Sequence, residues 1–423
     1  MRTLLLALLL AGSLGPSLAI AQTTAPVSPA PGLSLSDRRS DFTQFCHDFP
    51  ENYAYVDRPE KTWKTWSARY ARAVDTAETP EAFAAVLESA LDELHDFHAE
   101  VRSRNPHRWL PVPTFADIWA EFRGSEAVVI AVRKGSDAER ARVVPGDRIT
   151  QIDGTPLSQA LSERLTDAVD QKNPKAREWA LLSLLAGRAD AVRHFTLQKT
   201  GGQIRTVILP LQRRFDREPG PLTASALPEG IGLIRLHNSL GDQATVQAFD
   251  AALATLRSTR GLILDLRDVP SGGDSSVALG ILGRFVTRML PYQRHRIPNY
   301  GQPDIERNWI EQVAPRGPFP YTAPVVVLVD HWTGSMGEGM AIGFDAMHRG
   351  IVIGTPMAHL AGAVSDFTLP KTGMDVAFAT EQLYHVNGTP RQDWLPPILV
   401  ADPVSPGEDT ILKRGLAELQ RRH

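Results

Sequence analysis

Ser335 stands in a glycine-rich segment that could present a nucleophilic hydroxyl group. Residues 331–340 read His-Trp-Thr-Gly-Ser-Met-Gly-Glu-Gly-Met, directly after the apolar run Val325–Val329 and before a run of helical spacing that reaches about Met347. A serine flanked by glycines at a strand-to-helix turn exposes its hydroxyl and lets a substrate carbonyl approach closely. The amide of Met336 and the helix dipole would then lie beside a developing oxyanion. This arrangement suits acyl transfer to water.

A second glycine-rich turn could complete the oxyanion site. The apolar run Leu262–Leu266 is followed by Arg-Asp-Val-Pro and then by Ser271-Gly272-Gly273. Gly272 or Gly273 could supply another backbone amide to the same oxygen. Either turn alone is weak evidence, because Gly-Ser and Gly-Gly pairs are common at bends and helix starts. The interpretation therefore depends on both turns, each of which follows a buried strand.

An alternation of strand and helix patterns between about residues 225 and 412 positions these turns. Four short apolar runs predict strands that are buried on both faces; they are Ile231–Leu236, Gly261–Leu266, Val325–Val329 and Ile351–Ile353. A helical stripe lies between the first two; its members are Val246, Phe249, Leu253 and Leu256. We predict a multidomain α/β protein whose last domain, residues 225–412, is an α/β core with a mixed sheet. A linker from about Arg214 to Pro228 precedes it.

Two regions precede this core. Residues 36–106 have a helical period, and Thr79-Pro80 predicts an N-cap followed by proline at the first helical position. Residues 114–211 have a strand pattern with turn signals at Gly146 and at Asp153-Gly154. We expect a helical N-terminal region and a small β-barrel domain.

The N-terminus predicts a secretory signal peptide. A basic Arg2 precedes the apolar run Leu4–Leu10, and the small-residue pattern Ala19-Ile20-Ala21 follows. We expect cleavage after Ala21, which would assign residues 1–21 to the signal peptide. Residues 22–35, rich in Thr, Pro, Ala and Ser, predict a flexible linker. No run is as long as the roughly 20 apolar residues that a spanning helix needs, so we expect no membrane span and a periplasmic or secreted location.

Composition excludes several other classes. With 43% hydrophobic and 22% charged residues among 423, the chain can bury large cores and is not a disordered protein. A net charge of -3 gives no basic field, so we expect no nucleic-acid partner. The single cysteine, Cys46, excludes an internal disulfide and a four-cysteine zinc site. His95 and His98 could share a helix face, but no third ligand follows at a useful spacing, so we expect no metal.

Taken in order, these motifs resemble one family, the C-terminal-processing (tail-specific) serine peptidases with their tricorn-core relatives. The resemblance covers almost the whole chain after the signal peptide. Its motifs are Tyr53-Ala54-Tyr55, Leu94-x-Asp96-x-His98, the Asp265-Leu266-Arg267 and Gly272-Gly273 loop, the Ser335 elbow ending in Glu338, and Val352-Ile353-Gly354-Thr355. Residues 145–157, with Pro-Gly-Asp-x-Ile and Ile-Asp-Gly-x-x-Leu, resemble a bacterial PDZ domain. The resemblance implies an inserted PDZ-like domain over residues 114–211, a ClpP/crotonase-like core, a polypeptide substrate and no cofactor.

The resemblance also suggests a catalytic base. The family activates serine with a lysine in one branch and with a histidine in the other. Where the lysine branch reads Gly-Lys-Gly, this chain reads Leu360-Ala361-Gly362, so the lysine is missing. The histidine branch implies His98, and a neutral imidazole can take the serine proton near neutral pH. Four other histidines remain alternatives, with His359 first; the others are His331, His348 and His385.

The group that supports the base is less clearly indicated. The histidine branch has a glutamate late in the chain, and this chain has Gln392 at that position with Asp393 beside it. We favour Asp393, because a carboxylate stabilises an imidazolium better than an amide does, and we keep Gln392 and Asp96 as substitutes. Phe97, which precedes the base, also departs from the small polar residue of that branch.

Three functions remain open. The first is a secreted serine endopeptidase in which Ser335 attacks, His98 is the base, and the amides of Met336 with Gly272 or Gly273 hold the oxyanion. The second is a catalytically weak or inactive peptide-binding scaffold of the same fold. The third is a serine esterase or amidase for small molecules. The PDZ-like domain could bind peptide or act only as a spacer or lid.

Overall fold

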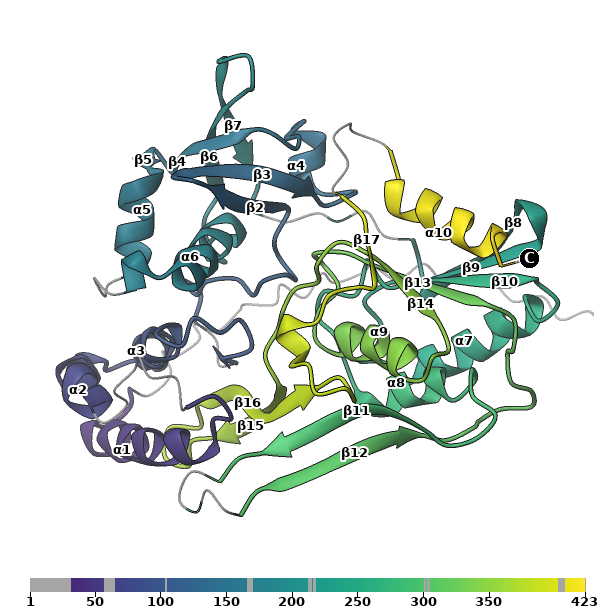
Figure 1. Ribbon diagram of the computed structural model, residues 1–423. Helices are drawn as coiled ribbons and strands as arrows, with labels where there is room; N and C mark the ends of the chain where they lie inside the picture. The colour runs from purple at the N-terminus through teal and green to yellow at the C-terminus, as the bar shows by residue number, and fades with distance from the viewer. Residues whose placement is uncertain are drawn as a thin grey trace, which may run out of the picture. The chain divides into compact units, whose positions relative to one another are not determined.

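The computed structural model describes residues 32–56, 65–102, 105–165, 170–211, 215, 218–299, 302, 305–401 and 408–422 (Figure 1). The expected signal peptide, residues 1–21, and most of the expected linker, residues 22–35, lie outside these ranges. No helix in the described ranges combines the length and the apolar character needed to cross a membrane.

Three helices open the described chain: α1 (Leu35–Asn52), α2 (Trp66–Thr76) and α3 (Pro80–Asp92). The Thr79 side chain accepts a hydrogen bond from the amide of Ala82, and Pro80 starts α3, as the sequence predicts. Aromatic side chains anchor this region to the core; the ring of Phe49 lies 4.9 Å from that of Phe378. The predicted helical period thus arises from apolar side chains on one face of each helix, which pack against the rest of the protein.

A module of one sheet and three helices follows, which we call the β2–β7 module. Its strands are β2 (Ile118–Arg123), β3 (Glu126–Val132), β4 (Arg148–Ile152), β5 (Thr155–Pro156), β6 (Arg193–Gln198) and β7 (Ile204–Leu209). Its helices are α4 (Asp137–Arg140), α5 (Leu157–Arg164) and α6 (Pro174–Ala186), and the short turn η2 (Asp170–Lys172) precedes α6. The sheet order is β2-β3-β4-β6-β7, with β5 paired to β4.

The β2–β7 module departs from a closed barrel. In the described residues β2 and β7 are edges of an open sheet, and α6 packs against β2 instead of a seventh strand pairing there. Ile149 and Ile152 are buried in its core as expected. The PDZ-like assignment itself stays a prediction.

The core has a six-stranded mixed sheet of order β17-β14-β13-β10-β9-β8. Its strands are β8 (Leu222–Leu227), β9 (Ile231–Leu236), β10 (Gly261–Asp265), β13 (Val325–Val329), β14 (Ile351–Gly354) and β17 (Ile398–Leu399). All pairs are parallel except β8 with β9. The turn η3 (Pro228–Gly230) joins β8 to β9. The linker expected up to Pro228 therefore contains a strand, β8, which lies at the edge of the sheet and whose residues are exposed or half-buried.

Helices cover both faces of this sheet (Figure 1). They are α7 (Ala244–Thr255), α8 (Ser275–Leu282), α9 (Met336–Ala346) and α10 (Thr410–Gln420). Alternate residues of one strand point to opposite faces. Val325 and Val327 accordingly pack with α7, α8 and α9, whereas Val326 and Leu328 pack with α10. The predicted mixed α/β architecture is confirmed.

A second sheet joins the helical region to the core. It has the order β1-β16-β11-β12, with β15 also paired to β16. Its strands are β1 (Glu100–Val101), β11 (Leu290–Ile297), β12 (Arg307–Val313), β15 (Ala363–Thr368) and β16 (Asp375–Tyr384). In the pairing of β1 with β16, Glu100 lies opposite Ala377. This register brings the turn before β1, which carries His98, to the C-terminal part of the chain.

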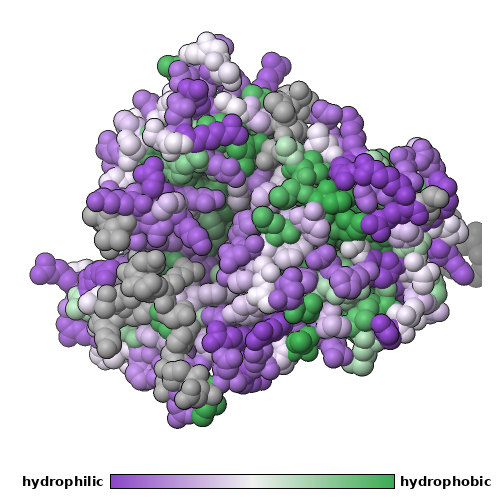
Figure 2. Space-filling model, in the orientation of Figure 1, coloured by the Kyte–Doolittle hydropathy of each residue, from purple (hydrophilic) through white to green (hydrophobic). Residues whose placement is uncertain are grey.

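The surface drawn in Figure 2 is mostly polar, with apolar side chains gathered near β17 and the start of α10. Leu395 and Leu399 are the exposed large apolar residues of this stretch. Exposed apolar residues are normal on a protein surface, so we assign this area no role.

Candidate active site

Ser335 lies at the turn from β13 to α9 and has a strained backbone. Its φ of 51° and ψ of -114° are unusual for a residue with a side chain. The amide of Gly334 donates to the carbonyl of Val269, which ties this turn to the second glycine-rich turn. A serine held in this way at a helix N-terminus is the elbow that the sequence predicts.

Glu338 fixes the backbone of the serine. Its buried Oε2 accepts hydrogen bonds from the amide of Ser335, at 2.8 Å, and from the amide of Leu360, at 3.3 Å. The Ser335 amide is therefore occupied. Met336, the first residue of α9, has no carbonyl within its own helix to which its amide could donate, so its amide is suited to an oxyanion.

Gly272 lies directly against Ser335. A Cβ atom built on Gly272 would lie 2.4 Å from the Ser335 Cβ and 2.7 Å from the Met336 nitrogen. A Cβ on Gly273 would lie 2.2 Å from the carbonyl carbon of Leu240. Neither position can take a side chain without a shift of its neighbours. The structure thus brings together Ser335, Met336 and Gly272, whereas the nearest atoms to the Cβ position of Gly273 belong to Leu240 and Gly241.

His98 is held by a hydrogen bond to a backbone carbonyl. Its Nδ1 lies 2.7 Å from the oxygen of Ala361. Because a carbonyl can only accept, Nδ1 carries the proton, and Nε2 of the neutral ring keeps its lone pair. The His98 amide donates to Oδ1 of Asp96, whose Oδ2 accepts from the Tyr53 hydroxyl. The ring is therefore in the tautomer that a general base needs.

One loop, residues 359–362, connects the serine to the histidine. The Leu360 amide binds the same Glu338 oxygen as Ser335, and the next residue, Ala361, binds His98. Within the described ranges, no hydrogen bond joins the Ser335 hydroxyl to His98. The two side chains thus flank a common loop but are not in direct hydrogen-bond contact.

The expected carboxylate support is not at the base. Asp393 is exposed, and neither it nor Gln392 has a hydrogen bond to His98 in the described part of the chain. The Gln392 carbonyl instead accepts from Nδ1 of His359, at 2.7 Å. The prediction of Asp393 as support has no basis in this geometry, because the Ala361 carbonyl occupies Nδ1.

The other candidate histidines are mostly engaged elsewhere. His331 stacks on Trp119 with ring centroids 5.1 Å apart. Nε2 of His385 lies 3.2 Å from Asp345, and His348 follows the C-terminal end of α9, away from the serine. His359 remains near the site, since it directly precedes Leu360.

Arg391, in the short turn η4 (Arg391–Asp393), holds the same loop. Its buried guanidinium donates to the carbonyl of Leu360, at 2.9 Å, and to that of Gly362, at 2.5 Å. These two carbonyls flank the Ala361 carbonyl that His98 uses. The loop is thus bound on both sides.

Burial and charge set the protonation states of this site. Loss of solvent lowers the pKa of His98 to about 4, and the charge of Arg391 acts in the same direction, against Asp96. Burial raises the pKa of Glu338 to about 7, against Arg391 and the backbone amides. At neutral pH the imidazole is therefore uncharged and able to accept a proton.

Sequence reasoning missed two of these contributions. Arg391 and Ala361 act through backbone carbonyls, which every residue type possesses, so their roles leave no pattern in the sequence. Glu338 did have a signal, because Ser-x-x-Glu at a helix start is a capping-box pattern. Within the described ranges, no three His, Cys, Asp or Glu side chains converge as metal ligands would.

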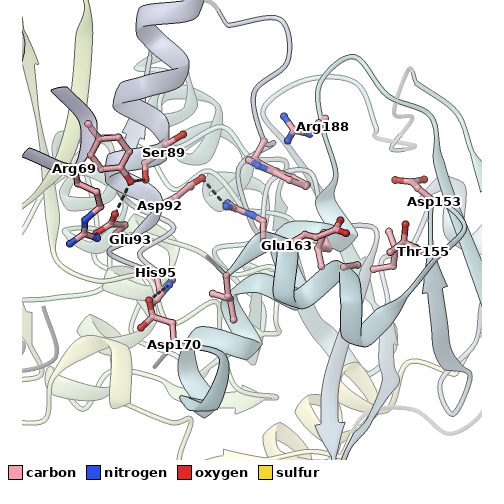
Figure 3. Close-up of a pocket in the computed structure, with 17 residues that line it drawn as sticks. Arg69, Ser89, Asp92, Glu93, His95, Asp153, Thr155, Glu163, Asp170 and Arg188 are labelled. Carbon is pink, nitrogen blue, oxygen red and sulfur yellow. Dashed lines mark hydrogen bonds and ion pairs between the residues drawn. The ribbon is translucent and has the colours of Figure 1, made fainter. Parts of the chain in front are cut away.

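A cavity of about 940 Å³ lies elsewhere, between α2 and α3 on one side and the β2–β7 module on the other (Figure 3). Several of its charged side chains pair with one another; the pairs are Arg69 with Glu93, Arg164 with Asp92, and His95 with Asp170. Neither Ser335 nor the 359–362 loop lines it. His95 makes the turn before His98 part of its wall, but the chemistry described above lies outside it.

Comparison with known proteins shows what the core is similar to. Residues 230–396 match the family model described as peptidase family S41. The chloroplastic C-terminal processing peptidase of Tetradesmus obliquus is 30% identical over 251 residues, which cover 55% of this chain and 47% of that protein. The chain thus matches about half the length of this curated relative.

Two solved structures have the same fold. The photosystem II D1 C-terminal processing protease has a TM-score of 0.56 at 18% identity and covers 89% of this chain and 96% of its own. Mature CPAF complexed with lactacystin has a TM-score of 0.57 at 15% identity and covers 92% of this chain and 97% of its own. At such identities the likeness concerns the fold alone.

A serine presented at a helix start on an α/β core, with backbone amides beside it, is the arrangement expected of a serine-type site. The family match is more specific: residues 230–396 of this chain are similar to peptidase family S41. The resemblance to C-terminal-processing serine peptidases that the sequence predicts is confirmed.

Proposed function

We propose that the chain is a serine endopeptidase that hydrolyses peptide bonds in polypeptides through an acyl-enzyme on Ser335. The observation that carries this proposal is the loop 359–362, which binds Glu338 beside the serine and His98 through adjacent residues. The loop therefore fixes the positions of Ser335 and His98, which are far apart in the sequence, relative to each other. The match of residues 230–396 to the peptidase family S41 model supports the same reaction.

In the proposed reaction the Ser335 oxygen attacks the peptide carbonyl and its proton passes to Nε2 of His98. The amides of Met336 and of Gly272 or Gly273 bind the oxyanion. His98 then protonates the leaving amine, and water repeats the sequence on the acyl-enzyme. The Ala361 carbonyl takes the supporting role that we expected of Asp393, and Asp96 adds negative charge from the turn of His98 itself. The hydroxyl must approach the imidazole in the substrate complex, because catalytic contacts often tighten only there.

A catalytically weak scaffold is the second candidate. It is favoured by the missing hydrogen bond between Ser335 and His98 and by a carbonyl, instead of a carboxylate, on Nδ1. A neutral acceptor stabilises an imidazolium less than a charged one.

A serine-directed phosphonate probe separates these candidates. We expect labelling of the wild type, no labelling of Ser335→Ala, and strongly slowed labelling of His98→Ala. His359→Ala is the matched control for the base and should label normally, as should His348→Ala. Equal labelling of His98→Ala and wild type would refute the proposed base. Parallel assays with an unfolded polypeptide and a small ester distinguish a peptidase from an esterase.

The β2–β7 module, proposed as PDZ-like, is bound to the loop before the serine. The Trp332 indole donates to the carbonyl of Ala116, and the apolar core of the module includes Trp332 and Leu360. These contacts favour a role of the module in supporting the active-site loops over a role as a free spacer.

We also propose that the protein is secreted or periplasmic after cleavage behind Ala21. The support is the sequence of residues 1–21 alone. Intact-mass measurement of the protein exported by a bacterial host tests it, since a retained residue 1–21 segment would contradict the proposal.

A further inference from the structure

We propose that Arg391 is a positioning residue for the Ser335 and His98 chemistry, because its guanidinium holds the 359–362 loop in the shape that orients the imidazole. This inference rests on the proposed function. It assigns a role to a side chain that touches neither the nucleophile nor the base by a hydrogen bond.

The hydrogen bonds of the loop are distributed in a regular way. Arg391 binds the carbonyls of Leu360 and Gly362, and His98 binds the carbonyl of Ala361 between them. The amide of Leu360 binds Glu338. Three successive carbonyls and one amide are therefore engaged, so a rotation of any peptide group in the loop breaks at least one of these bonds.

The far end of the loop is fixed by packing. Gly362 has a φ of +62°, and a Cβ atom there would lie 2.3 Å from the Glu381 carbonyl oxygen on β16. The loop cannot move toward β16. Removal of the guanidinium would therefore leave residues 360–361 free to relax in other directions, which would displace the hydrogen-bond partners of His98 and Glu338.

The charge of Arg391 has no carboxylate bound to it. All its hydrogen bonds in the described part of the chain go to backbone carbonyls. Burying a charged group is costly unless it is paired with an opposite charge and hydrogen-bonded, and Arg391 has only the hydrogen bonds. The charged groups that act on His98 are Arg391 from η4 and Asp96 from the turn of His98 itself, and Arg391 also acts on Glu338 from α9. The guanidinium therefore disfavours the imidazolium and favours the ionised Glu338.

The planar fork of arginine explains why this residue type is needed. One guanidinium can donate to two separate carbonyls at once, whereas the ammonium of lysine is a compact point charge on a flexible stem. Lysine would keep the positive charge, but its ammonium group would not hold the carbonyls of Leu360 and Gly362 at the same distance from each other.

The experiment compares Arg391→Met and Arg391→Lys with the wild type. Arg349→Met is the matched control, because Arg349 also donates to backbone carbonyls, those of Phe285, Tyr321 and Ala323, away from the site. The measurements are thermal unfolding, kcat and KM on a polypeptide substrate, and the His98 pKa from NMR of histidine labelled at Cε1.

We expect kcat to fall about 10-fold or more in both Arg391 variants, with KM changed less than about 2-fold, because the loop orients the base and not the substrate. The His98 pKa should rise by about one unit in Arg391→Met and should stay low in Arg391→Lys. Arg349→Met should lower the melting temperature but change neither kcat nor the His98 pKa.

Folded Arg391 variants with wild-type kcat would overturn the positioning role. Should the wild type itself prove inactive, the proposed function fails, but the NMR titration still decides on Arg391. An unchanged His98 pKa in Arg391→Met would then refute the inference.

Discussion

The replacement Gly272→Ala tests the oxyanion geometry most directly. The added Cβ would lie 2.4 Å from the Ser335 Cβ and 2.8 Å from its hydroxyl oxygen, whereas ordinary contacts begin at about 3.4 Å. One of the two turns must therefore move by about 1 Å. A misplacement of about 1 Å at a catalytic group costs about 100-fold in rate, or about 2.7 kcal/mol.

Backbone strain must be separated from this effect. Gly272 has a φ of +63°, which lies in the left-handed region of backbone conformation. An alanine in that region lowers the folding stability of a protein by about 1–2 kcal/mol wherever it occurs. Gly124→Ala is the matched control, because Gly124 has a φ of +65° in the turn between β2 and β3 and no atom lies within 4 Å of its Cβ position. Both variants should melt a few degrees below the wild type.

The assay measures kcat/KM on a polypeptide and the rate of phosphonate labelling at pH 7 with each variant below its melting temperature. We expect a loss of about 100-fold for Gly272→Ala and less than about 2-fold for Gly124→Ala. Equal activity of the two variants would show that the Gly272 turn does not contribute to the reaction.

Three other predictions concern the protonation and the support of the site. Since His98 must be neutral to act and its pKa is lowered to about 4, kcat/KM should stay constant on acidification until about pH 4; a fall centred near pH 6.5 would contradict the assignment. Asp393→Asn should change kcat by less than about 2-fold. Asp96→Asn should lower kcat about 10-fold, because Asp96 accepts hydrogen bonds from both the His98 amide and the Tyr53 hydroxyl. A larger loss for Asp393→Asn than for Asp96→Asn would restore Asp393 as the support. For Glu338 the folded pKa of about 7 exceeds the unfolded value of 4.5, so this carboxyl lowers the free energy of unfolding as the pH rises between these values. The glutamine variant lacks this effect, so the melting temperature of Glu338→Gln minus that of the wild type should increase from pH 4.5 to pH 7. A difference that stays constant over this range would contradict the raised pKa.

Much of the core could be predicted because its strands are buried on both faces. Runs such as Val325–Val329 have no polar residue to confuse the pattern, and β13 has the expected bounds. In contrast, β8 escaped prediction, because an edge strand with exposed residues looks like a linker in sequence. The serine elbow was predictable since glycines and a strand end mark it.

The orientation of the base could not be predicted for a different reason. The partner of His98 is the carbonyl of Ala361, and Arg391 holds the same loop through carbonyls. Sequence patterns report side-chain types, whereas these contacts depend on backbone positions set by tertiary packing. The carboxylate expected to support the base, Asp393, is exposed.

The pairing of the two-residue strand β1 with β16 has a consequence for biosynthesis. His98 and the carbonyl that orients it are 263 residues apart along the chain, so a ribosome must pass Ala361 before this contact can form and must complete β16 before β1 can pair with it. Contacts of such separation also form late in folding, since a long loop must close first. We expect the proposed peptidase activity to be absent from the nascent polypeptide during translation, because Ser335, His98 and the 359–362 loop come together only once almost the entire protein has emerged.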